Sequence, residues 1–329
     1  MIRRTACLVS RSQDAWRNQA IEKHLMDTLP EDTAVLFLWQ DTCAVLLGRG
    51  QSAAEACAPE QLARRKGQLA RRLSGGGGLY MDGGCLGFSV ILPKSAFDVS
   101  RQMSILGMTL GAFGLQARTA GPCDLGVGDV CVGRSAYYKS GSAAWHHGAL
   151  LIQADLDALG GVLLPDGQRH FAAVQNVSAL CPGLTMEDVQ RTLCQAFAHG
   201  YGSEPAWLDE RMLDGRTIDG LTAAFSRDGW VNPPAVQETF SVTERFPWGG
   251  ATVHMAVEGG VIRQARFSTD AMEAALFERV APSLVGAPFL ISAIAARFDQ
   301  SLQWLSDPHL MQIAQDVCNL ICRRLRQQH

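Results

Sequence analysis

The stretch that decides the fold reads Arg71-Arg72-Leu73-Ser74-Gly75-Gly76-Gly77-Gly78-Leu79-Tyr80. Consecutive glycines let backbone N–H groups converge and let a ligand approach the chain closely. The paired arginines add fixed positive charge, which suits a phosphate or an acyl-phosphate anhydride. The spacing matches neither a Walker phosphate loop nor a dinucleotide fingerprint. A flexible surface loop is the alternative, and the strand-like runs on both sides of the glycines disfavour it.

The chain around this stretch shows alternating helical and strand patterns. Residues 14–29 predict an amphipathic helix ended by Pro30. Residues 34–39 and 44–47 are short apolar runs that predict two adjacent strands. The other predicted elements are helices at 59–66, 100–115 and 184–199, a strand at 86–92, and a hairpin of 128–138 with 145–152.

A second unit follows the linker-like run Asn232-Pro233-Pro234. Its pattern predicts three strands and then three helices, at residues 240–246, 251–257, 260–268, 272–285, 291–298 and 310–326. Strands grouped before helices are typical of an α+β domain. We therefore expect an α+β protein with a large domain at residues 1–234 and a small one at residues 235–329.

The bulk composition excludes several classes of protein. With 329 residues, 47% of them hydrophobic and 19% charged, the chain is of ordinary globular composition. A net charge of −3 argues against a nucleic-acid partner. No uncharged apolar run reaches 18 residues and no signal sequence begins the chain, so we expect a cytoplasmic protein without a membrane partner. The ten cysteines are scattered, as expected for free thiols in a reducing compartment.

Residues 71–77 resemble the RRxSGGG signature of the lipoate-protein ligase A family, within the biotin and lipoate ligase superfamily. Other segments resemble further motifs of this family, in order along nearly the whole chain. They are 14–22 (N-terminal helix), 37–40 and 48–51 (first strands and GRxQ turn), 145–151 (FHHGTLL strand), 176–177 with 182–183 (NL…PG), and 244–250 with 267–270 (accessory domain). The resemblance implies a catalytic domain with a large mixed or antiparallel sheet and a small α+β accessory domain.

The family joins lipoate to ATP, which gives lipoyl-AMP and pyrophosphate, and then passes the lipoyl group to a lysine of a lipoyl domain. The resemblance therefore implies lipoate and ATP as substrates and Mg²⁺ as the ion that neutralises the phosphates. It also implies a carrier-protein partner, either a lipoyl domain of a 2-oxoacid dehydrogenase complex or a protein like the H protein of glycine cleavage. We expect the protein to act as a monomer.

The sequence departs from the family at the lysine that contacts the carboxyl and phosphate of the intermediate. Counting back from His146 without gaps places Cys131 at that position. In a regular strand Arg134 points to the other face, and Lys139 lies roughly 26 Å further along, at about 3.3 Å per residue. Neither cation replaces the lysine unless the strand contains a bulge, for which Gly133 is the natural place.

Other departures gather around the same pocket. Met81, Cys85, Cys123 and Ala149 stand where the family has polar residues. We interpret this concentration as a change of ligand or chemistry in the pocket, or a loss of chemistry.

The candidate site residues are those that match family motifs. Cys131 and Asp124 are the catalytic candidates, and Asp124 is also the candidate ligand of Mg²⁺. The candidates for binding lipoate and ATP are Arg49, Arg71, Arg72, Ser74, Gly75, Gly76, Gly77, Gly78, Asp82, Ser135, His146, Gly148 and Asn176. His146 and His147 face opposite sides of a strand, so we expect one structural and one pocket-facing histidine, not a metal pair.

Three functions remain open at this point. The first is an ATP-dependent ligase of lipoate or a related acid. The second is an acyltransferase, such as an octanoyltransferase, that holds the acyl group on Cys131, Cys123 or Cys85, which requires a lowered thiol pKa. The third is a non-catalytic homologue that binds a lipoyl group, a nucleotide or a lipoyl domain.

Overall fold

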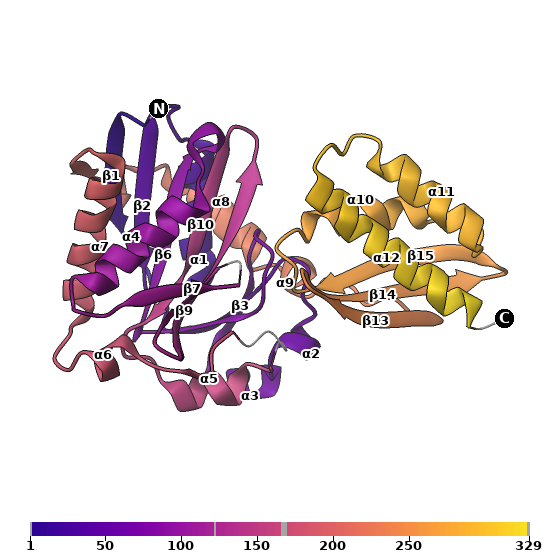
Figure 1. Ribbon diagram of the computed structural model, residues 1–329, viewed down its shortest axis with the longest axis horizontal. Helices are drawn as coiled ribbons and strands as arrows, with labels where there is room; N and C mark the ends of the chain where they lie inside the picture. Colours follow the sequence, from indigo (N-terminus) through magenta and orange to yellow (C-terminus); the bar gives the residue numbers. More distant parts are fainter. Residues whose placement is uncertain (1, 122, 166–169, 328–329) are drawn as a thin grey trace. The chain divides into compact units, whose positions relative to one another are not determined.

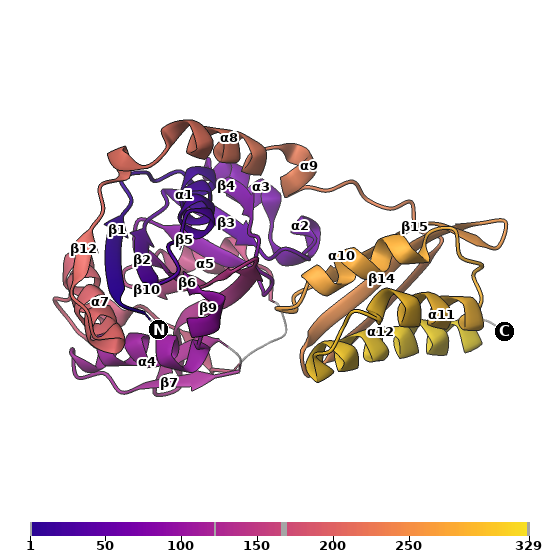
Figure 2. The same ribbon diagram turned by 90° about the horizontal axis from the view of Figure 1, so that it is seen from above.

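The computed structural model describes residues 2–121, 123–165 and 170–327, and the chain divides into two compact units (Figures 1 and 2). Unit 1 contains Met1–Leu47, Ala53–Arg72 and Gly78–Val231. Unit 2 contains Asn232–His329 together with two short segments from the first part of the chain, Gly48–Ser52 and Leu73–Gly77. The sequence patterns did not predict this assignment of the two segments.

Unit 1 is built on a mixed sheet with the strand order β12-β1-β2-β6-β10-β9-β8-β7, with β11 also pairing β9. Its strands are β1 (Arg4–Val9), β2 (Thr33–Trp39), β6 (Cys85–Pro93), β7 (Ala117–Ala120), β8 (Asp124–Val127), β9 (Val130–Ser140), β10 (Ala143–Leu151), β11 (Ala173–Val174) and β12 (Pro205–Trp207). The pairs β1–β2, β1–β12 and β9–β11 are parallel, and the other pairs are antiparallel. The large mixed sheet expected from the resemblance is confirmed.

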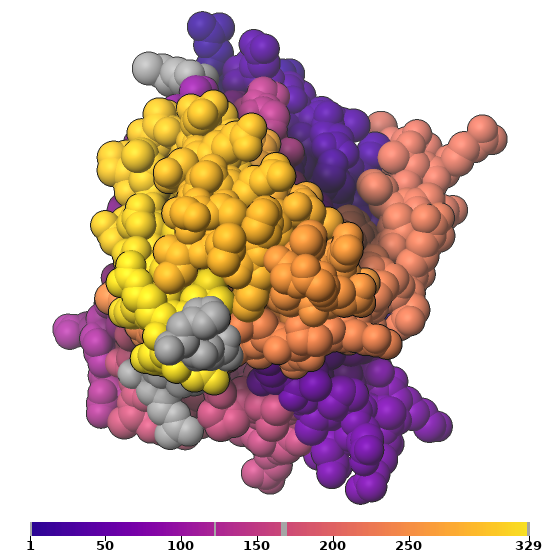
Figure 3. Space-filling model, turned by 90° about the vertical axis from the view of Figure 1, so that its right-hand side faces the viewer, coloured from indigo at the N-terminus to yellow at the C-terminus, as the bar shows by residue number. Residues whose placement is uncertain are grey.

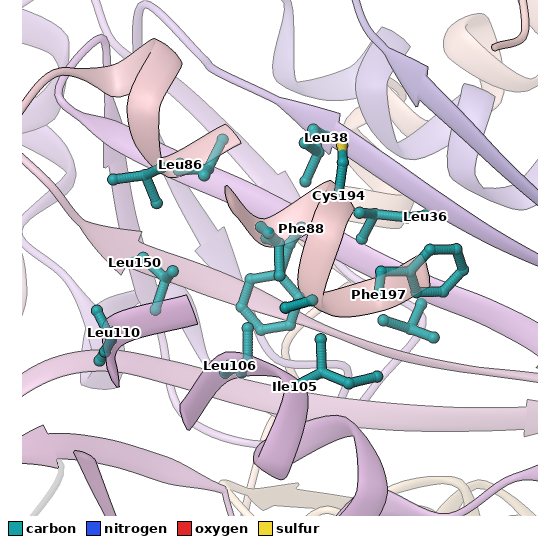
Figure 4. Close-up of a cluster of buried hydrophobic side chains, with 14 of the residues drawn as sticks. Leu36, Leu38, Leu86, Phe88, Ile105, Leu106, Leu110, Leu150, Cys194 and Phe197 are labelled. Atoms are coloured by element: carbon teal, nitrogen blue, oxygen red, sulfur yellow. The ribbon is translucent and has the colours of Figure 1, made fainter. Parts of the chain in front are cut away.

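Helices cover both faces of this sheet (Figure 2). On one face lie α1 (Ala15–Asp27) and α8 (Gly215–Phe225), and on the other lie α4 (Val99–Gly111) and α7 (Met186–Tyr201). The main core fills the space between the sheet and the pair α4 and α7, where side chains such as Phe88, Leu106 and Phe197 interdigitate (Figure 4). The predicted capped start of α7 is confirmed, since Thr185 and Asp188 form a reciprocal capping box.

A second, three-stranded sheet of unit 1 has the order β4-β3-β5. The remaining elements of unit 1 are β3 (Cys43–Leu47), β4 (Gln68–Arg71), β5 (Leu79–Asp82), α2 (Ala53–Ala56), α3 (Pro59–Arg64), η1 (Lys94–Ala96), α5 (Leu156–Val162), α6 (Val177–Leu180), η2 (Glu210–Met212) and α9 (Asp228–Val231). The prediction that β2 and β3 are adjacent strands is wrong. Trp39 pairs with Gly87 in the large sheet, whereas Cys43 pairs with Asp82 in the small one. The connection redirects the chain because Asp41 is fully buried and accepts a hydrogen bond from Asn18.

The predicted hairpin is confirmed as β9 and β10, but the other edge of β9 is irregular. Against β8, Leu125 pairs with Gly133, and the next residue, Gly126, pairs with Cys131. Val132 is therefore an extra residue on β9, which is the two-against-one count of a β-bulge. β9 pairs with β10 without a register shift from Ser140 to Gly133. The extra residue lies immediately beside Gly133, the position at which the sequence allowed a bulge.

Unit 2 consists of a three-stranded antiparallel sheet and three helices, in agreement with the predicted α+β accessory domain. Its elements are β13 (Phe240–Phe246), β14 (Gly249–Glu258), β15 (Val261–Thr269), α10 (Ala275–Leu284), α11 (Ile291–Leu302) and α12 (Pro308–Arg326). Buried residues of β14, such as Val253 and Met255, form one core with the apolar faces of the helices. Figure 3 shows one face of this unit, where residues coloured orange to yellow form the surface.

The two short segments of unit 2 are held by backbone hydrogen bonds. The N–H of Thr269 donates to Gly50 O at 2.9 Å, and that of Gly76 donates to Ala271 O at 3.1 Å. A Cβ atom on Gly75 would lie 2.2 Å from Ala271 O, so only glycine permits this approach. The glycine-rich loop is therefore packed against the chain that follows β15.

Candidate functional site

A small buried cavity lies in unit 1 beneath α1. Its volume is about 10 Å³, which is roughly the room needed by one water molecule. The cavity is lined by Asn18, Gln19, Glu22, Trp39, Leu46, Arg72, Leu79, His147 and Gly148. Trp39 reaches this place because its ring lies over Gly87, where a Cβ atom would come within 2.3 Å of the indole.

A buried polar cluster forms one wall of this cavity. Ser89 and His147 are cross-strand partners on β6 and β10, so both side chains project toward Glu22 on α1. Nδ1 of His147 lies 2.7 Å from Oε1 of Glu22, and the Ser89 hydroxyl donates to the same oxygen. Each of the three residues is buried. Buried polar groups are costly unless they are hydrogen-bonded, and Oε1 of Glu22 has two such partners in this cluster.

Arg71 and Arg72 lie side by side in the sequence but make different contacts. Arg71 donates to the carbonyl oxygens of Trp230 and Val231, with the shortest distance 2.8 Å, and thereby holds the end of α9. Arg72 lines the cavity and donates to Leu46 O at 2.6 Å. Burial lowers the pKa of Arg72 to about 10, against the opposing effect of the Glu22 carboxylate. Arg72 therefore stays charged at neutral pH.

The two histidines of β10 face opposite sides of the strand, as its alternation predicts. His147 lines the cavity, whereas His146 is fully buried beside Phe88 on the face of the main core. Nε2 of His146 lies 2.8 Å from the Ser135 hydroxyl, which itself donates to Cys123 O at 2.8 Å. The Ser135 hydroxyl has one proton and donates it to Cys123 O, so it can only accept from His146. Nε2 of His146 must therefore carry the N–H. Burial, and secondarily His147, lower the pKa of His146 to about 3, so this histidine is neutral.

Gly148 lets β9 and β10 approach each other closely. A Cβ atom at this position would lie 2.2 Å from Arg134 O and 2.7 Å from the Cα of Ser135. Any larger residue would also intrude on the cavity that Gly148 lines. Glycine is therefore needed here for steric reasons.

A second polar cluster lies at the bulge of β9. The Arg134 guanidinium lies 3.6 Å from Oδ1 of Asp124, its register partner on β8, and Nδ1 of His170 lies 2.8 Å from Oδ2 of the same carboxyl. The pKa of the Cys131 thiol is raised by burial and by the Asp124 carboxylate, and Arg134 acts in the opposite direction. Arg134 is therefore close enough to Cys131 to interact with it. The sequence predicted that Arg134 faces away from Cys131, on the assumption of a regular strand. The strand is not regular here, because it contains the bulge at Val132.

The three cysteines considered as nucleophiles, Cys85, Cys123 and Cys131, are all buried. Burial raises the pKa of both Cys131 and Cys85, and Cys123 is also buried. The thiolate is the reactive form of cysteine, and a raised pKa disfavours it.

Two of the predicted binding residues make contacts with loop backbone. Asp82 accepts hydrogen bonds from the N–H groups of Gly84 at 2.8 Å and Asp155 at 2.9 Å. Asn176 makes a reciprocal pair with the backbone of Ala154, with both distances 2.9 Å. These contacts join the loops that follow β5, β10 and β11.

The predicted residues of the glycine loop are divided between the units. Gly78 belongs to unit 1, whereas Ser74, Gly75, Gly76 and Gly77 belong to unit 2. Arg49 also lies in unit 2, where its N–H donates to Ser74 O at 2.8 Å. The Arg49 side chain forms an ion pair with Glu278 of α10, with Nη2 and Oε2 2.7 Å apart.

Metal binding has weak support in the described ranges. No group of three or more His, Cys, Asp or Glu side chains able to hold an ion occurs among residues 2–121, 123–165 and 170–327. Both oxygens of Asp124 already face nitrogen atoms, from His170 and Arg134.

No helix among the described residues 2–121, 123–165 and 170–327 is long and apolar enough to cross a membrane.

Five residues of the two clusters were missing from the sequence-based set of site residues: Glu22, Ser89, Arg134, His147 and His170. The pattern of α1 could have indicated Glu22, since an acidic residue four positions after Asn18 on the inner face requires a buried partner. The adjacent histidines did indicate one residue facing a pocket. Arg134 was set aside on the assumption of a regular strand, because the sequence shows where a bulge is possible, at Gly133, but not whether it forms.

Comparison with known proteins agrees with this architecture. Residues 14–198 match the lipoyl protein ligase A/B catalytic domain, and residues 236–312 match the bacterial lipoate protein ligase C-terminus. The structure of P. falciparum LipL1 in complex with lipoate is similar, with a TM-score of 0.85 and 20% identity over 97% of this chain and 99% of that one. A bipartite lipoate protein ligase of Thermoplasma acidophilum has a TM-score of 0.61 and 20% identity, over 72% of this chain and 99% of that one. A lipoate-protein ligase A bound with ATP has a TM-score of 0.59 and 21% identity, over 70% and 98%. The chain belongs to the lipoate-protein ligase family and carries both its catalytic domain and its C-terminal domain.

Proposed function

We propose that this protein is an ATP-dependent ligase that activates lipoate or a related acid and transfers the acyl group to a lysine of a lipoyl carrier domain. The observation that carries the proposal is the bulge of β9, which brings the Arg134 guanidinium next to Cys131. A cation is thus available beside the position where the family has its lysine. Similar structures support these ligands and this partner, since one is a complex with lipoate, one is bound with ATP and one is of a ligase and its E2 lipoyl domain.

The first step joins the acid to the nucleotide. A carboxylate oxygen of the acid attacks the α-phosphorus of ATP, and the bond to pyrophosphate breaks. Negative charge on the phosphate and the carboxyl must be neutralised for this step. We assign that role to Arg134, which Asp124 orients at 3.6 Å. The cavity beside Arg72 and Glu22 receives the chain of the acid once its walls move apart.

The second step releases AMP. The amine of the carrier lysine, after losing a proton, attacks the acyl carbonyl, and the bond from carbonyl carbon to phosphate oxygen breaks. Arg134 stays positively charged throughout, since a guanidinium is not deprotonated in this pH range. It therefore stabilises the departing phosphate but does not take the proton.

Magnesium enters the proposal with the nucleotide. Mg²⁺ commonly binds through one or two carboxylates and the substrate phosphates. Asp124 fits a direct ligand poorly, because an arginine and a histidine already face its oxygens. We therefore derive no step through an ion bound to Asp124.

The thiol mechanism has less support than the ligase. Cys131 and Cys85 are buried and have raised pKa values, so each would have to be exposed and deprotonated before it could attack. The C-terminal domain also has no role in that mechanism.

The test is the intact mass of an apo lipoyl domain after incubation with the protein, lipoate, ATP and Mg²⁺. A gain of one lipoyl group that requires ATP is the expected result. A thioester adduct on the protein itself, formed without ATP, would establish the acyltransferase instead. An unmodified carrier and an unmodified protein, beside an active ligase in a parallel tube, would leave the non-catalytic homologue.

A further inference from the structure

The wall of the cavity contributed by α1 contains an unsatisfied amide. Gln19 is 8% exposed and lines the cavity, and its Nε2 atom has no hydrogen-bond partner among the described residues. A buried polar group without a partner is costly, so few survive in folded proteins unless a ligand or water completes them.

The neighbouring polar groups of the wall are already engaged. Asn18 donates to Asp41 at 2.8 Å and accepts from Ser10 at 2.6 Å, so its amide serves the fold. Glu22 accepts from two side chains, and Arg72 donates to a backbone carbonyl. Gln19 differs from these three, because its buried nitrogen remains available to a molecule that enters the cavity.

We infer that the cavity selects an acid whose chain carries a hydrogen-bonding oxygen or nitrogen, in preference to a plain hydrocarbon chain. The inference rests on the proposed function and specifies its substrate class. The unpaired Nε2 of Gln19 is a donor, so the oxygen of a hydroxyl, a ketone or an amide on the chain would accept its hydrogen bond. A straight alkyl chain would leave the Gln19 amide buried and unpaired. Lipoate would rank between the two, since its ring sulfurs are weak acceptors.

The expected discrimination is substantial. A site built to hydrogen-bond a substrate rejects an analogue without the polar group far better than an apolar pocket rejects an extra methylene. We expect the wild-type protein to prefer hydroxy- or oxo-octanoates over octanoate by at least about tenfold in kcat/KM. Replacing Gln19 with an apolar residue of similar size should remove this preference.

The experiment measures ATP-dependent pyrophosphate release with octanoate, lipoate and octanoates that carry a hydroxyl or oxo group at successive positions. It compares the wild type with Gln19→Leu and Gln19→Met, and with Gln61→Leu on the exposed face of α3 as the matched control. The expected result is loss of the preference for oxygenated acids in both Gln19 variants and no change in the control. Two variants of different shape keep the test valid if one of them folds poorly.

Two outcomes would overturn the inference. One is a wild type that uses octanoate as well as any oxygenated acid, and the other is a preference that survives in both Gln19 variants. If no acid gives pyrophosphate, the proposed function fails, and binding of the same acids is then measured by calorimetry. Tighter binding of oxygenated acids that is lost in Gln19→Leu would still support the inference, and equal binding would refute it.

Discussion

Replacing Arg134 tests whether a residue displaced by a bulge performs the task of the missing lysine. Removing one preorganised group that stabilises charge in a transition state typically lowers kcat by about 10² to 10³. Arg134→Gln should lower acyl-adenylate formation by a factor in this range. The side chains of Arg134 and Asp124 are 32% and 14% exposed, and such partly exposed pairs contribute about 1 kcal/mol or less to stability. Activity should therefore fall while the thermal midpoint hardly changes.

The companion variant restores the family arrangement. Cys131→Lys combined with Arg134→Gln returns an ammonium group to the motif position. The double variant should form acyl-adenylate at least about tenfold faster than Arg134→Gln alone. Pyrophosphate release and carrier mass are measured for wild type, single and double variants, with Arg191→Gln on α7 as a control that removes an exposed ion pair. An Arg134→Gln enzyme within about threefold of wild type would refute the assignment.

Three further predictions concern stability. Burial raises the pKa of Asp41 to about 7, so the folded state favours the protonated carboxyl. The stability that this protonated carboxyl gives the fold is fully present below pH 3.8, and it is lost as the pH rises through 7. Asp41→Asn removes this titration, so the free energy of unfolding of the variant minus that of wild type should rise by about 2 to 4 kcal/mol from pH 5 to pH 8. Urea titrations at both pH values measure this difference. An equal difference at pH 5 and pH 8 would contradict the assignment. Gly148→Ala places a methyl group 2.2 Å from Arg134 O and should lower the free energy of unfolding by about 1 to 3 kcal/mol or more, which calorimetry measures. Gly75→Ala places a methyl group 2.2 Å from Ala271 O and should loosen the glycine loop from Ala271. Limited proteolysis should then cut within residues 73–77 faster than in wild type. An unchanged cutting rate would show that the loop adapts to the methyl group.

The elements of both units could largely be predicted from the sequence. Asp14 caps α1, and Thr185 with Asp188 caps α7, because short polar side chains satisfy the free N–H groups of a first turn. The three strands of unit 2 follow from apolar runs separated by glycine turns. These signals are local, which is why they can be read from one sequence.

Partnerships between distant segments could not be predicted in this way. The runs of β2 and β3 look like neighbours, but the two strands belong to different sheets and Asp41 is buried between them. A single extra residue, Val132, changes which side chains of β9 meet Asp124. Strand alternation is a rule of regular ladders, so it fails where the ladder gains a residue.

The membership of the glycine loop in unit 2 has a consequence for synthesis of the chain. Gly50 and Gly76 leave the ribosome early, but their partners Thr269 and Ala271 follow roughly 200 residues later. At about 5 to 20 residues per second, the loop waits roughly 10 to 40 s for the backbone that anchors it. Unit 1 can fold during this delay, while the glycine loop is completed last. A nascent or truncated chain that ends before β15 would therefore contain the cavity beneath α1 without an anchored loop.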